Sequence, residues 1–303
     1  MSQTAAAAPL RLGTRGSLLA RTQSQQVADS ITAATGRAVD LVVVRTEGDD
    51  LTVPLDSPSR PGAFAAALRD ALLDGRIDLA VHSFKDLPSA PLPGLTVTAI
   101  PPRADPRDAW CSRDGLGLAG LPAGAKVGTS SPRRAAGLRR ARPDLEVVAI
   151  RGNVDTRLRK VAEAQVDAAV LAAAGLLRLG RQAAITEFID PGVLLPAPAQ
   201  GALAVECRSG ELTDELGAID DARTRLAVTA ERAILAGIEA TCTTAVGALA
   251  TWIDEDRLEL TVEVSGHRGI VFERISRTGR VGSSSQATAL GLAICVELAP
   301  KMS

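Results

Sequence analysis

The stretch from Lys126 to Lys160 constrains the fold more than any other, because it contains one pattern twice. Two short apolar runs, AKVGTS and LEVVAI, each lead into a turn rich in arginine and small polar residues, and helix-forming sequence follows each turn. Turns of this kind lie together at the carboxyl edge of a parallel sheet, where α/β proteins bind their ligands. The stretch therefore predicts an α/β lobe with a ligand site at that edge.

The first of these turns has the chemistry of an anion site. Either Ser130 or Ser131 can cap a helix that begins at Pro132. Proline has no backbone N–H, but the N–H at the first helical position has no partner within the helix, so proline is well tolerated there. Unpaired backbone N–H groups at the start of a helix attract anions. The next two residues are Arg133 and Arg134, which add positive charge at the same place.

The basic residues of the stretch fall into two groups. Guanidinium groups bind carboxylates and phosphates through pairs of parallel hydrogen bonds. The four arginines beside the turns are expected to bind the ligand: Arg133, Arg134, Arg151 and Arg157. The others fit a solvated helix face, the usual role of a charge run: Arg139, Arg140, Arg142, Arg159 and Lys160. The expected ligand is a polyanion.

The composition argues against a nucleic-acid binder. The formal net charge is -1 and the pI is near 6.2, so acidic residues elsewhere balance the basic stretch. Aromatic residues make up 2% of the chain and tyrosine is absent, which removes the stacking platforms of single-strand binders. These features favour a focused anion pocket, with no nucleic acid as partner.

The cysteines and the N-terminus suggest a cytoplasmic protein. The four cysteines lie far apart and form no C-x-x-C pair, so neither a zinc site nor a disulfide framework is indicated: Cys111, Cys207, Cys242 and Cys295. Free cysteines suit a reducing cytosol. The first ten residues, MSQTAAAAPL, lack a basic segment and a long apolar run, and no run approaches the roughly 18 apolar residues of a membrane span. We expect no membrane partner.

The rest of the chain repeats the alternation of strand and helix. The expected strands of the first half are LRLGT (10–14), VDLVVVRT (39–46), IDLAVHS (77–83) and LTVTAI (95–100), with helices over 17–31 and 63–75 between them. The segment near residues 50–62 is rich in Pro, Gly, Ser and Asp and predicts a long loop, a common form of lid. The passage after Ile100 predicts a crossing between domains, with Cys111 in a loop.

Two further strand ends carry polar groups. Arg15, Gly16 and Ser17 form a third strand-to-helix junction. His82 and Asp86 belong to a fourth, where a carboxylate among cationic neighbours can stabilise a developing positive charge. His82 could do chemistry, but a single histidine at a strand end is more often a structural hydrogen-bond partner.

The pattern changes near Asp220, after which a helix, three strands and a closing helix predict a small α+β domain with an antiparallel sheet. The predicted domains are 1–102 with 202–219, 103–201, and 220–303, and the hinge between the two α/β lobes contains Gln200 and Gly201. Cys242 lies in a loop of the last domain. Its position leaves open whether the thiol is used, whereas Cys207 and Cys295 look like buried strand and helix residues.

Taken together, six motifs in order resemble porphobilinogen deaminase: RLGTRGSLLA, VHSFKDLP, VGTSSPRR, AIRGNVDTRL, LPAPAQGALAVECR and the loop with Cys242. The resemblance runs from about Leu10 to Cys295. It implies three domains, the first two similar to periplasmic binding proteins, and a dipyrromethane cofactor joined by a thioether to Cys242. The implied reaction condenses four porphobilinogen molecules head to tail with loss of ammonia and releases hydroxymethylbilane by hydrolysis.

The resemblance also implies a role for individual residues. Asp86 matches the catalytic aspartate. The cofactor-binding residues it implies are Cys242, Lys85, Asp86, Thr129, Ser130, Ser131, Arg133, Arg134, Arg151 and Gly152. The substrate-binding residues are Arg15, Ser17, Arg151, Arg157, Gln200 and Phe64. No metal is implied, and the expected oligomeric state is a monomer. Thr241 stands where the family often has glycine, and the loop near Arg60 lacks the family's lysine.

Two other classes of protein remain as alternatives. A two-lobed binding protein for an anionic solute needs the arginines but neither Asp86 nor Cys242, and the absence of an export signal counts against it. A nucleic-acid binder that uses residues 126–160 predicts binding with a steep dependence on salt.

Overall fold

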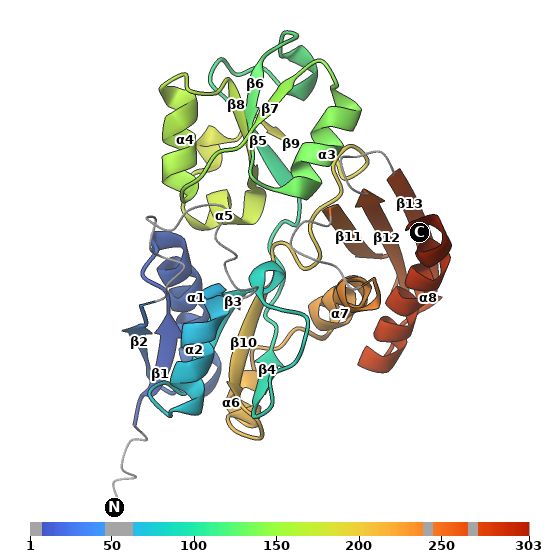
Figure 1. Cartoon of the computed structure of the whole chain (residues 1–303). Coiled ribbons are helices and arrows are strands. Elements are labelled where there is room, and N and C mark those ends of the chain that lie inside the picture. Colours follow the sequence, from blue (N-terminus) through green and yellow to red (C-terminus); the bar gives the residue numbers. More distant parts are fainter. Residues whose placement is uncertain (1–7, 46–62, 239–244, 266–271, 303) are drawn as a thin grey trace, which may run out of the picture. The chain divides into compact units, whose positions relative to one another are not determined.

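The computed structural model describes residues 8–45, 63–238, 245–265 and 272–302 (Figure 1). The chain forms two compact units, Met1–Arg103 with Ala202–Ala222, and Ala104–Gly201 with Arg223–Ser303. The division into three domains remains a prediction.

The first unit is built on a five-stranded sheet in the order β2-β1-β3-β10-β4. Strands β1, β2 and β3 are parallel, and β10 is antiparallel to both of its neighbours. The strands are β1 (Leu10–Thr14), β2 (Val39–Val43), β3 (Leu79–Ser83), β4 (Leu95–Ala99) and β10 (Leu203–Arg208). The helices are α1 (Leu18–Thr35), α2 (Ala63–Leu73), α6 (Thr213–Gly217) and the 3-10 turn η2 (Phe84–Asp86).

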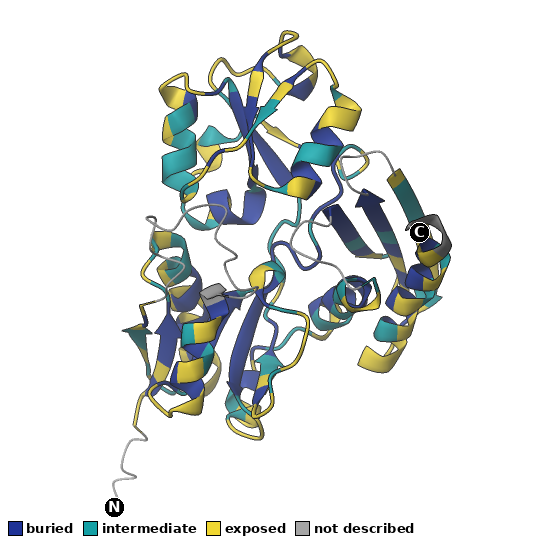
Figure 2. Ribbon diagram, in the orientation of Figure 1, coloured by how far each residue is buried: buried dark blue, intermediate teal, exposed yellow. Residues whose placement is uncertain are grey.

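The apolar faces of α1 and α2 pack against this sheet in two separate clusters. Val27 and Ile31 of α1 pack with Leu10, Leu12 and other strand residues. In the other cluster, leucines of α2 pack with residues that include Ile77 and Ala80. The central strands β3 and β10 are therefore buried on both faces and are dark in Figure 2, whereas the edge strand β2 is only partly covered.

The second unit contains a sheet with the same plan, in the order β7-β6-β8-β5-β9. Strands β6, β7 and β8 are parallel, and β5 is antiparallel to β8 and β9. The strands are β5 (Asp108–Ser112), β6 (Lys126–Gly128), β7 (Glu146–Val148), β8 (Ala168–Ala172) and β9 (Glu187–Phe188). The helices are α3 (Pro132–Ala141), α4 (Val154–Ala162), α5 (Ala173–Arg178), η3 (Leu118–Gly120) and η4 (Gln182–Ala184).

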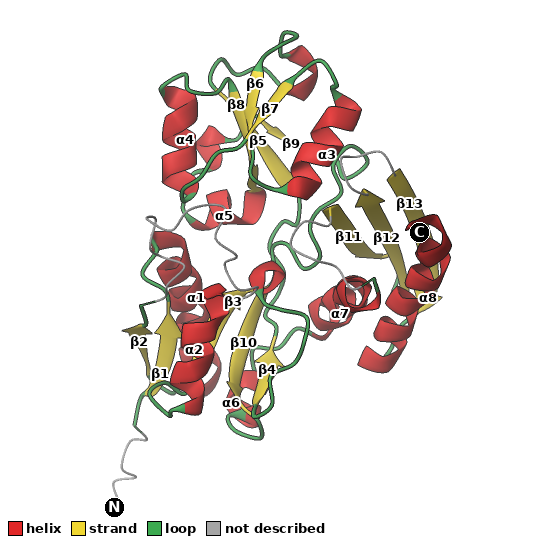
Figure 3. Cartoon of the chain, viewed as in Figure 1, coloured by secondary structure: helices red, strands yellow, loops and turns green. Residues whose placement is uncertain are grey.

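The C-terminal part of the chain is an antiparallel meander with helices against it (Figure 3). Its elements are α7 (Ala222–Gly237), β11 (Ala245–Trp252), β12 (Arg257–Ser265), β13 (Phe272–Arg280) and α8 (Ser284–Met302). Residues of α7, α8 and the three strands share one apolar core. The predicted fold class, two α/β lobes and a small C-terminal α+β part, is confirmed.

One predicted loop is wrong. Residues 108–112 form β5, so Cys111 lies in a strand and not in a loop, and it is 1% exposed. The strand escaped notice because it is buried on both faces, which removes the alternation of polar and apolar residues, and because Pro102 and Pro106 precede it. Burial raises the pKa of the Cys111 thiol to about 12, so Cys111 stays protonated at neutral pH. Cys207 and Cys295 are buried, as predicted.

Arg140 also differs from its expected role on a solvated helix face. Its guanidinium pairs with the buried carboxylate of Glu263 at 2.8 Å, and Arg274 pairs with the same carboxylate at 2.7 Å. Arg140 further donates to the carbonyl of Val193 and lies over the ring of Phe272. It therefore fastens α3 to the C-terminal sheet within the second unit.

Candidate functional site

The carboxyl edge of the first sheet brings two of the predicted junctions together. Strands β1 and β3 are parallel neighbours, with Leu12 opposite Leu79 and Gly13 opposite Ala80. The junctions that follow them therefore leave the sheet at one edge. Arg15 lies half-buried after β1, and Asp86 is exposed at the end of the 3-10 turn after β3.

The junction after β1 is the start of a helix. Ser17 caps α1, its Oγ accepting a hydrogen bond from the backbone N–H of Ala20 at 3.3 Å. The first turn of α1 contains no acidic residue that would neutralise the positive end of the helix dipole. This helix N-terminus can therefore attract an anion.

The turn that carries Asp86 is held by several hydrogen bonds. The backbone N–H of Phe84 donates to the carbonyl of Ala202 at 3.1 Å, and that of Leu87 donates back to Phe84 at 3.3 Å. The Ser83 hydroxyl donates to Oε1 of the buried Gln23 at 3.1 Å. Lys85 and Asp86 therefore stand on a fixed backbone.

Behind this turn lies a buried polar network that the sequence did not reveal. Nε2 of His82 lies 3.0 Å from Oε2 of Glu206, on the neighbouring strand β10. Arg69 of α2 donates to the same carboxylate from Nε and Nη2, at 2.9 to 3.1 Å. Burial acts to raise the pKa of Glu206, but the hydrogen bonds from His82 and Arg69 outweigh burial and hold it below its ordinary value. His82 thus has the structural partner that its position favoured.

In the second unit the loops after β6 and β7 are joined by hydrogen bonds. The N–H of Thr129 donates to Val148, and the hydroxyl of Ser130 donates to the carbonyl of Ile150. Ser131 caps α3, accepting from the N–H of Arg134, and Pro132 begins the helix, which settles the choice between the two serines.

Gly152 shapes the second of these loops. Its φ is +114°, a region that residues with a side chain rarely adopt. A Cβ at this position would lie 2.5 Å from Cγ2 of Thr156 and 2.7 Å from its Cβ. Arg151 beside it is exposed, while Arg157 folds back so that its Nε donates to the carbonyl of Gly152 at 2.8 Å.

Arg133 and Arg134 share a buried carboxylate, Asp108 of β5. Arg133 donates from Nη2 to Oδ2 at 2.7 Å, and Arg134 from Nε and Nη2 to Oδ1 at 3.0 and 2.7 Å. The side chain of Asp108 is completely buried, and those of both arginines are 7% exposed. Gln200, also buried, adds a bond from Nε2 to Oδ1 at 2.9 Å.

Asp108 is ionised within this cluster. Burial acts to raise its pKa, but the charges of Arg133 and Arg134, with hydrogen bonds from Arg134 and Gln200, hold it far below its ordinary value. Burial and the proximity of Arg134 also lower the pKa of Arg133, although Asp108 acts in the opposite direction. The cluster contains two positively charged guanidinium groups and one carboxylate, so it keeps a net positive charge.

The same edge holds two further desolvated arginines. Burial, and then repulsion from Arg134, lowers the pKa of Arg157. Burial lowers the pKa of Arg178, at the end of α5, to about 10. Among the described residues neither guanidinium has a carboxylate partner, and Arg178 donates only to the carbonyl of Gly201 at 2.9 Å. A partly buried cation without a counter-ion is costly unless an anion binds there.

Asp108 and Arg178 were missed by the sequence analysis. Asp108 carried one signal, an acidic residue at the start of an apolar run, RDAWC. Arg178 carried another, a single arginine within the apolar helix AGLLRLG that directly follows a strand.

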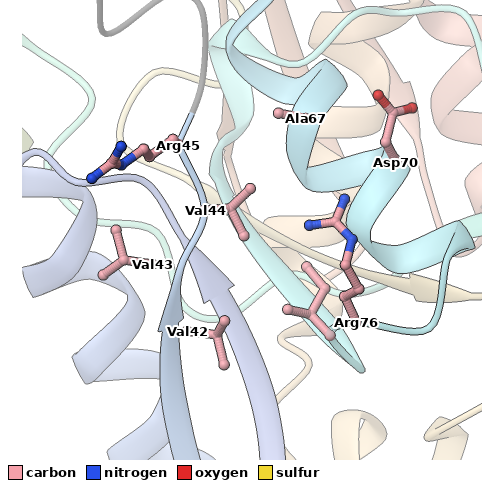
Figure 4. A pocket seen from close by; sticks show the side chains of 8 residues that line it. Val42, Val43, Val44, Arg45, Ala67, Asp70 and Arg76 are labelled. Carbon is pink, nitrogen blue, oxygen red and sulfur yellow. The ribbon is translucent and has the colours of Figure 1, made fainter.

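Three of the predicted features lie outside the described residues: Cys242 with its neighbour Thr241, the loop around Arg60, and the side chain of Phe64. A pocket of about 410 Å³ lies in the first unit beside the edge strand β2 (Figure 4). It is lined by Val42, Val43, Val44, Arg45, Ala67, Asp70, Arg76 and Ile77. None of the predicted site residues lines it, so it is not assigned to the site.

The two edges define an α/β protein with an exposed carboxylate at one strand end and a desolvated arginine cluster that fits a polycarboxylate. The chain belongs to the porphobilinogen deaminase family. Residues 10–214 match the family model "Porphobilinogen deaminase, dipyromethane cofactor binding domain", and residues 225–299 match the model of its C-terminal domain. The chain is therefore an enzyme of tetrapyrrole synthesis that polymerises porphobilinogen and uses a dipyrromethane cofactor, as the motifs predicted.

Individual relatives agree with this assignment. The chain is 52% identical to porphobilinogen deaminase of Nocardia farcinica, over 98% of this chain and 88% of the relative. It is 50% identical to that of Mycobacterium marinum, over 95% of this chain and 94% of the relative.

Solved structures give weaker matches. A periplasmic substrate-binding protein of an ABC transporter from Coxiella burnetii matches with a TM-score of 0.44 and 15% identity, over 71% of this chain and 93% of that one. A substrate-binding domain of a putative amino acid ABC transporter from Streptococcus pneumoniae matches at 0.45 and 11% identity, over 70% and 90%. Scores below 0.5 do not establish a shared fold. No helix in the described part of the chain is long and apolar enough to cross a membrane.

Proposed function

We propose that this chain condenses four porphobilinogen molecules head to tail, with loss of ammonia, on a primer joined by a thioether to Cys242, and that it releases hydroxymethylbilane by hydrolysis. The observation that carries the proposal is the pair of desolvated arginines, Arg157 and Arg178, for which the described residues supply no carboxylate. Pyrroles with acetate and propionate groups supply several. The residues present therefore fit dipyrromethane and its elongated forms.

The arginine-rich edge is proposed to bind and orient carboxylates. When bound, dipyrromethane supplies the pyrrole ring to which the first substrate is added. Arg151 is exposed, and Arg157 and Arg178 are only partly covered, so their guanidinium groups can pair with ligand carboxylates bidentately. The N-terminus of α3 adds neutral N–H donors. The Ser130 hydroxyl already donates to Ile150, so Ser130 is proposed to contribute by holding the two cofactor-binding loops together.

Asp108 changes how Arg133, Arg134 and Gln200 contribute. Their side chains already hold its carboxylate, and Nη1 of each arginine donates to a backbone carbonyl, that of Leu195 or Val170. The two arginines are therefore proposed to contribute to cofactor and substrate binding through the net positive charge of the cluster, while Gln200 keeps Asp108 in place. Thr129 is buried, and its Oγ1 accepts from the N–H of Ser131 at 3.2 Å. Thr129 and Gly152 are proposed to shape the cofactor-binding loops.

At the edge of the first sheet, Asp86 is proposed as the catalytic residue. Its exposed carboxylate can accept hydrogen bonds from pyrrole N–H groups and stabilise positive charge that develops as ammonia leaves. Lys85 is proposed to bind a cofactor carboxylate. Arg15, the Ser17 cap of α1 and Phe64 are proposed to bind the substrate.

The test of this assignment is the turnover of porphobilinogen by Asp86→Asn, with Asp74→Asn as the matched control, since the Asp74 side chain is 62% exposed and lies away from the strand end. We expect Asp86→Asn to lose turnover by about a hundredfold or more while it keeps its fold, because general acid–base groups contribute that much. Unimpaired turnover by Asp86→Asn would remove Asp86 from the mechanism.

The remaining properties of the protein are also proposals. It is proposed to work as a monomer in the cytoplasm, with porphobilinogen as its partner and no nucleic acid. The net charge of -1 and the low aromatic content support the last point.

A further inference from the structure

A turn at residues 199–201 connects the arginine cluster to the rest of the second unit. Gln200 donates from its side chain to Asp108 and to the carbonyl of Pro106, at 2.9 and 2.8 Å. The carbonyl of Gly201 accepts from Arg178 at 2.9 Å. The turn therefore touches both Asp108, which holds Arg133 and Arg134, and the partly buried Arg178.

The backbone of this turn is strained. Ala199 has a φ of +59°, in the left-handed region that residues with a Cβ enter only at a cost. Gly201 has a φ of +89°, and a Cβ there would lie 2.5 Å from the carbonyl oxygen of Ala104. A turn of this shape persists only where its surroundings hold it.

Glu231 of α7 supplies such a hold on the turn. Its side chain is completely buried, and Oε2 accepts a hydrogen bond from the N–H of Ala199 at 2.6 Å. Oε1 accepts from the N–H of Ala250 on β11 at 2.8 Å. Ala250 belongs to the edge strand of the C-terminal sheet, and Ala248 of the same strand donates to the carbonyl of Pro196 at 2.9 Å.

The chemistry of these contacts requires a carboxylate. The groups of Ala199 and Ala250 are N–H donors, so a side chain that binds both of them must present an acceptor oxygen to each. A glutamine of the same shape would turn an NH₂ group toward one of the two N–H groups. Exchange of Glu231 for glutamine therefore removes one of these bonds and leaves a buried donor unpaired.

We infer that Glu231 is a positioning residue that sets the geometry of the arginine cluster by holding the turn 199–201, and that it ties this turn to β11. The inference rests on the proposed role of the cluster in binding pyrrole carboxylates. In the sequence β11 begins three residues after Cys242, so Glu231 binds both the strand that follows the proposed attachment residue in the chain and the turn beside the arginine cluster.

The test compares Glu231→Gln with the control Glu259→Gln, at an exposed position of β12. We expect Glu231→Gln to raise the KM for porphobilinogen about tenfold, the scale of one lost hydrogen bond to a charged group, and to change kcat by less than about threefold. The control should match wild type. A KM for Glu231→Gln within about twofold of the control would overturn the inference.

A second substitution separates positioning from a general loss of stability. Glycine adopts a φ near +59° without strain, so Ala199→Gly lets the turn form without help from Glu231. In the double variant Glu231→Gln, Ala199→Gly, the KM should return to within about threefold of that of Ala199→Gly alone. A KM that stays raised in the double variant would show that Glu231 does not act through the turn.

Hydrogen exchange of the wild-type protein tests the same contact without any substitution. The backbone amides of Ala199 and Ala250 should exchange slowly, and exchange of the Ala199 amide as fast as that of exposed loop amides contradicts the inference, even if Glu231→Gln fails to fold. This readout does not depend on the reaction. If wild type fails to consume porphobilinogen, the proposed function fails, and exchange at Ala199 still decides whether Glu231 holds the turn.

Discussion

Arg134 binds the carboxylate of Asp108 through two nitrogen atoms, Nε at 3.0 Å and Nη2 at 2.7 Å, and both reach the same oxygen. The other oxygen of Asp108 is left for Arg133. A single buried carboxylate thereby orients two of the arginines that the sequence assigned to the ligand. The two arginines at the ligand-binding edge are therefore held in place by Asp108 of β5, which lies outside the arginine-rich stretch 126–160.

Removal of the charge of Asp108 should destabilise the protein strongly. In Asp108→Asn the two buried guanidinium groups lose their carboxylate, and breaking such a buried pair costs about 3 to 5 kcal/mol. We expect the free energy of unfolding in urea to fall by that amount. Asp74→Asn, at an exposed position, should change it by less than about 0.5 kcal/mol. A loss for Asp108→Asn as small as that of the control would contradict the burial argument.

The lowered pKa values of Asp108 and Glu206 predict how stability depends on pH. A carboxyl whose pKa is lower in the folded than in the unfolded protein stabilises the fold fully above its unfolded pKa, near 4. That contribution is lost as the pH falls toward the folded pKa. Stability should therefore drop below about pH 4, and the drop should be shallower in Asp108→Asn. The free energy of unfolding is measured by urea titration at several pH values between 3 and 5. If it falls with pH equally steeply in wild type and in Asp108→Asn, Asp108 does not cause the loss of stability.

Arg178→Met should affect activity and stability in opposite ways. The guanidinium is partly buried without a carboxylate among the described residues, so an apolar side chain of similar length should leave the free energy of unfolding unchanged or higher. Turnover at low porphobilinogen concentration should fall at least tenfold, because a carboxylate-binding group is lost. Arg181→Met, at a position whose side chain is 52% exposed, is the control. Normal turnover with lowered stability would make Arg178 a structural residue.

Loss of Arg69 should weaken the support behind Asp86. In Arg69→Met the buried Glu206 keeps the hydrogen bond from His82 but loses its bidentate partner, whose side chain is 11% exposed. We expect about 3 kcal/mol less stability by thermal or urea unfolding. Arg76→Met, whose ion pair with Asp74 is exposed, should cost less than about 0.5 kcal/mol. A similar effect of the two substitutions would show that the buried network adds nothing.

The sequence predicted local structure well, because local chemistry determines it. β1 spans Leu10–Thr14 as expected, and Pro132 begins α3 behind a serine cap. The polar strand ends were found because a strand followed by a turn and a helix fixes where the turn lies in a parallel sheet. The class of ligand followed from the arginines at those turns.

The partners of these residues could not be predicted. Arg133 and Asp108 lie 25 residues apart and His82 and Glu206 lie 124 apart, and nothing local in the sequence pairs them. β5 was missed because burial on both faces removes the alternation of polar and apolar residues, and its pairing with β8 and β9 is again a contact between distant segments. Whether an arginine pairs with the protein or with a ligand is decided by these distant contacts.

The mass of the intact protein tests most directly whether the chain carries a pyrrole primer on Cys242. Purified wild type should exceed its sequence mass by that of two linked pyrrole units, and Cys242→Ser should show the sequence mass alone. Cys207→Ser, which changes a buried cysteine of the first unit, should carry the same addition as wild type. An addition that persists in Cys242→Ser, or a wild type of unmodified mass, would contradict the account.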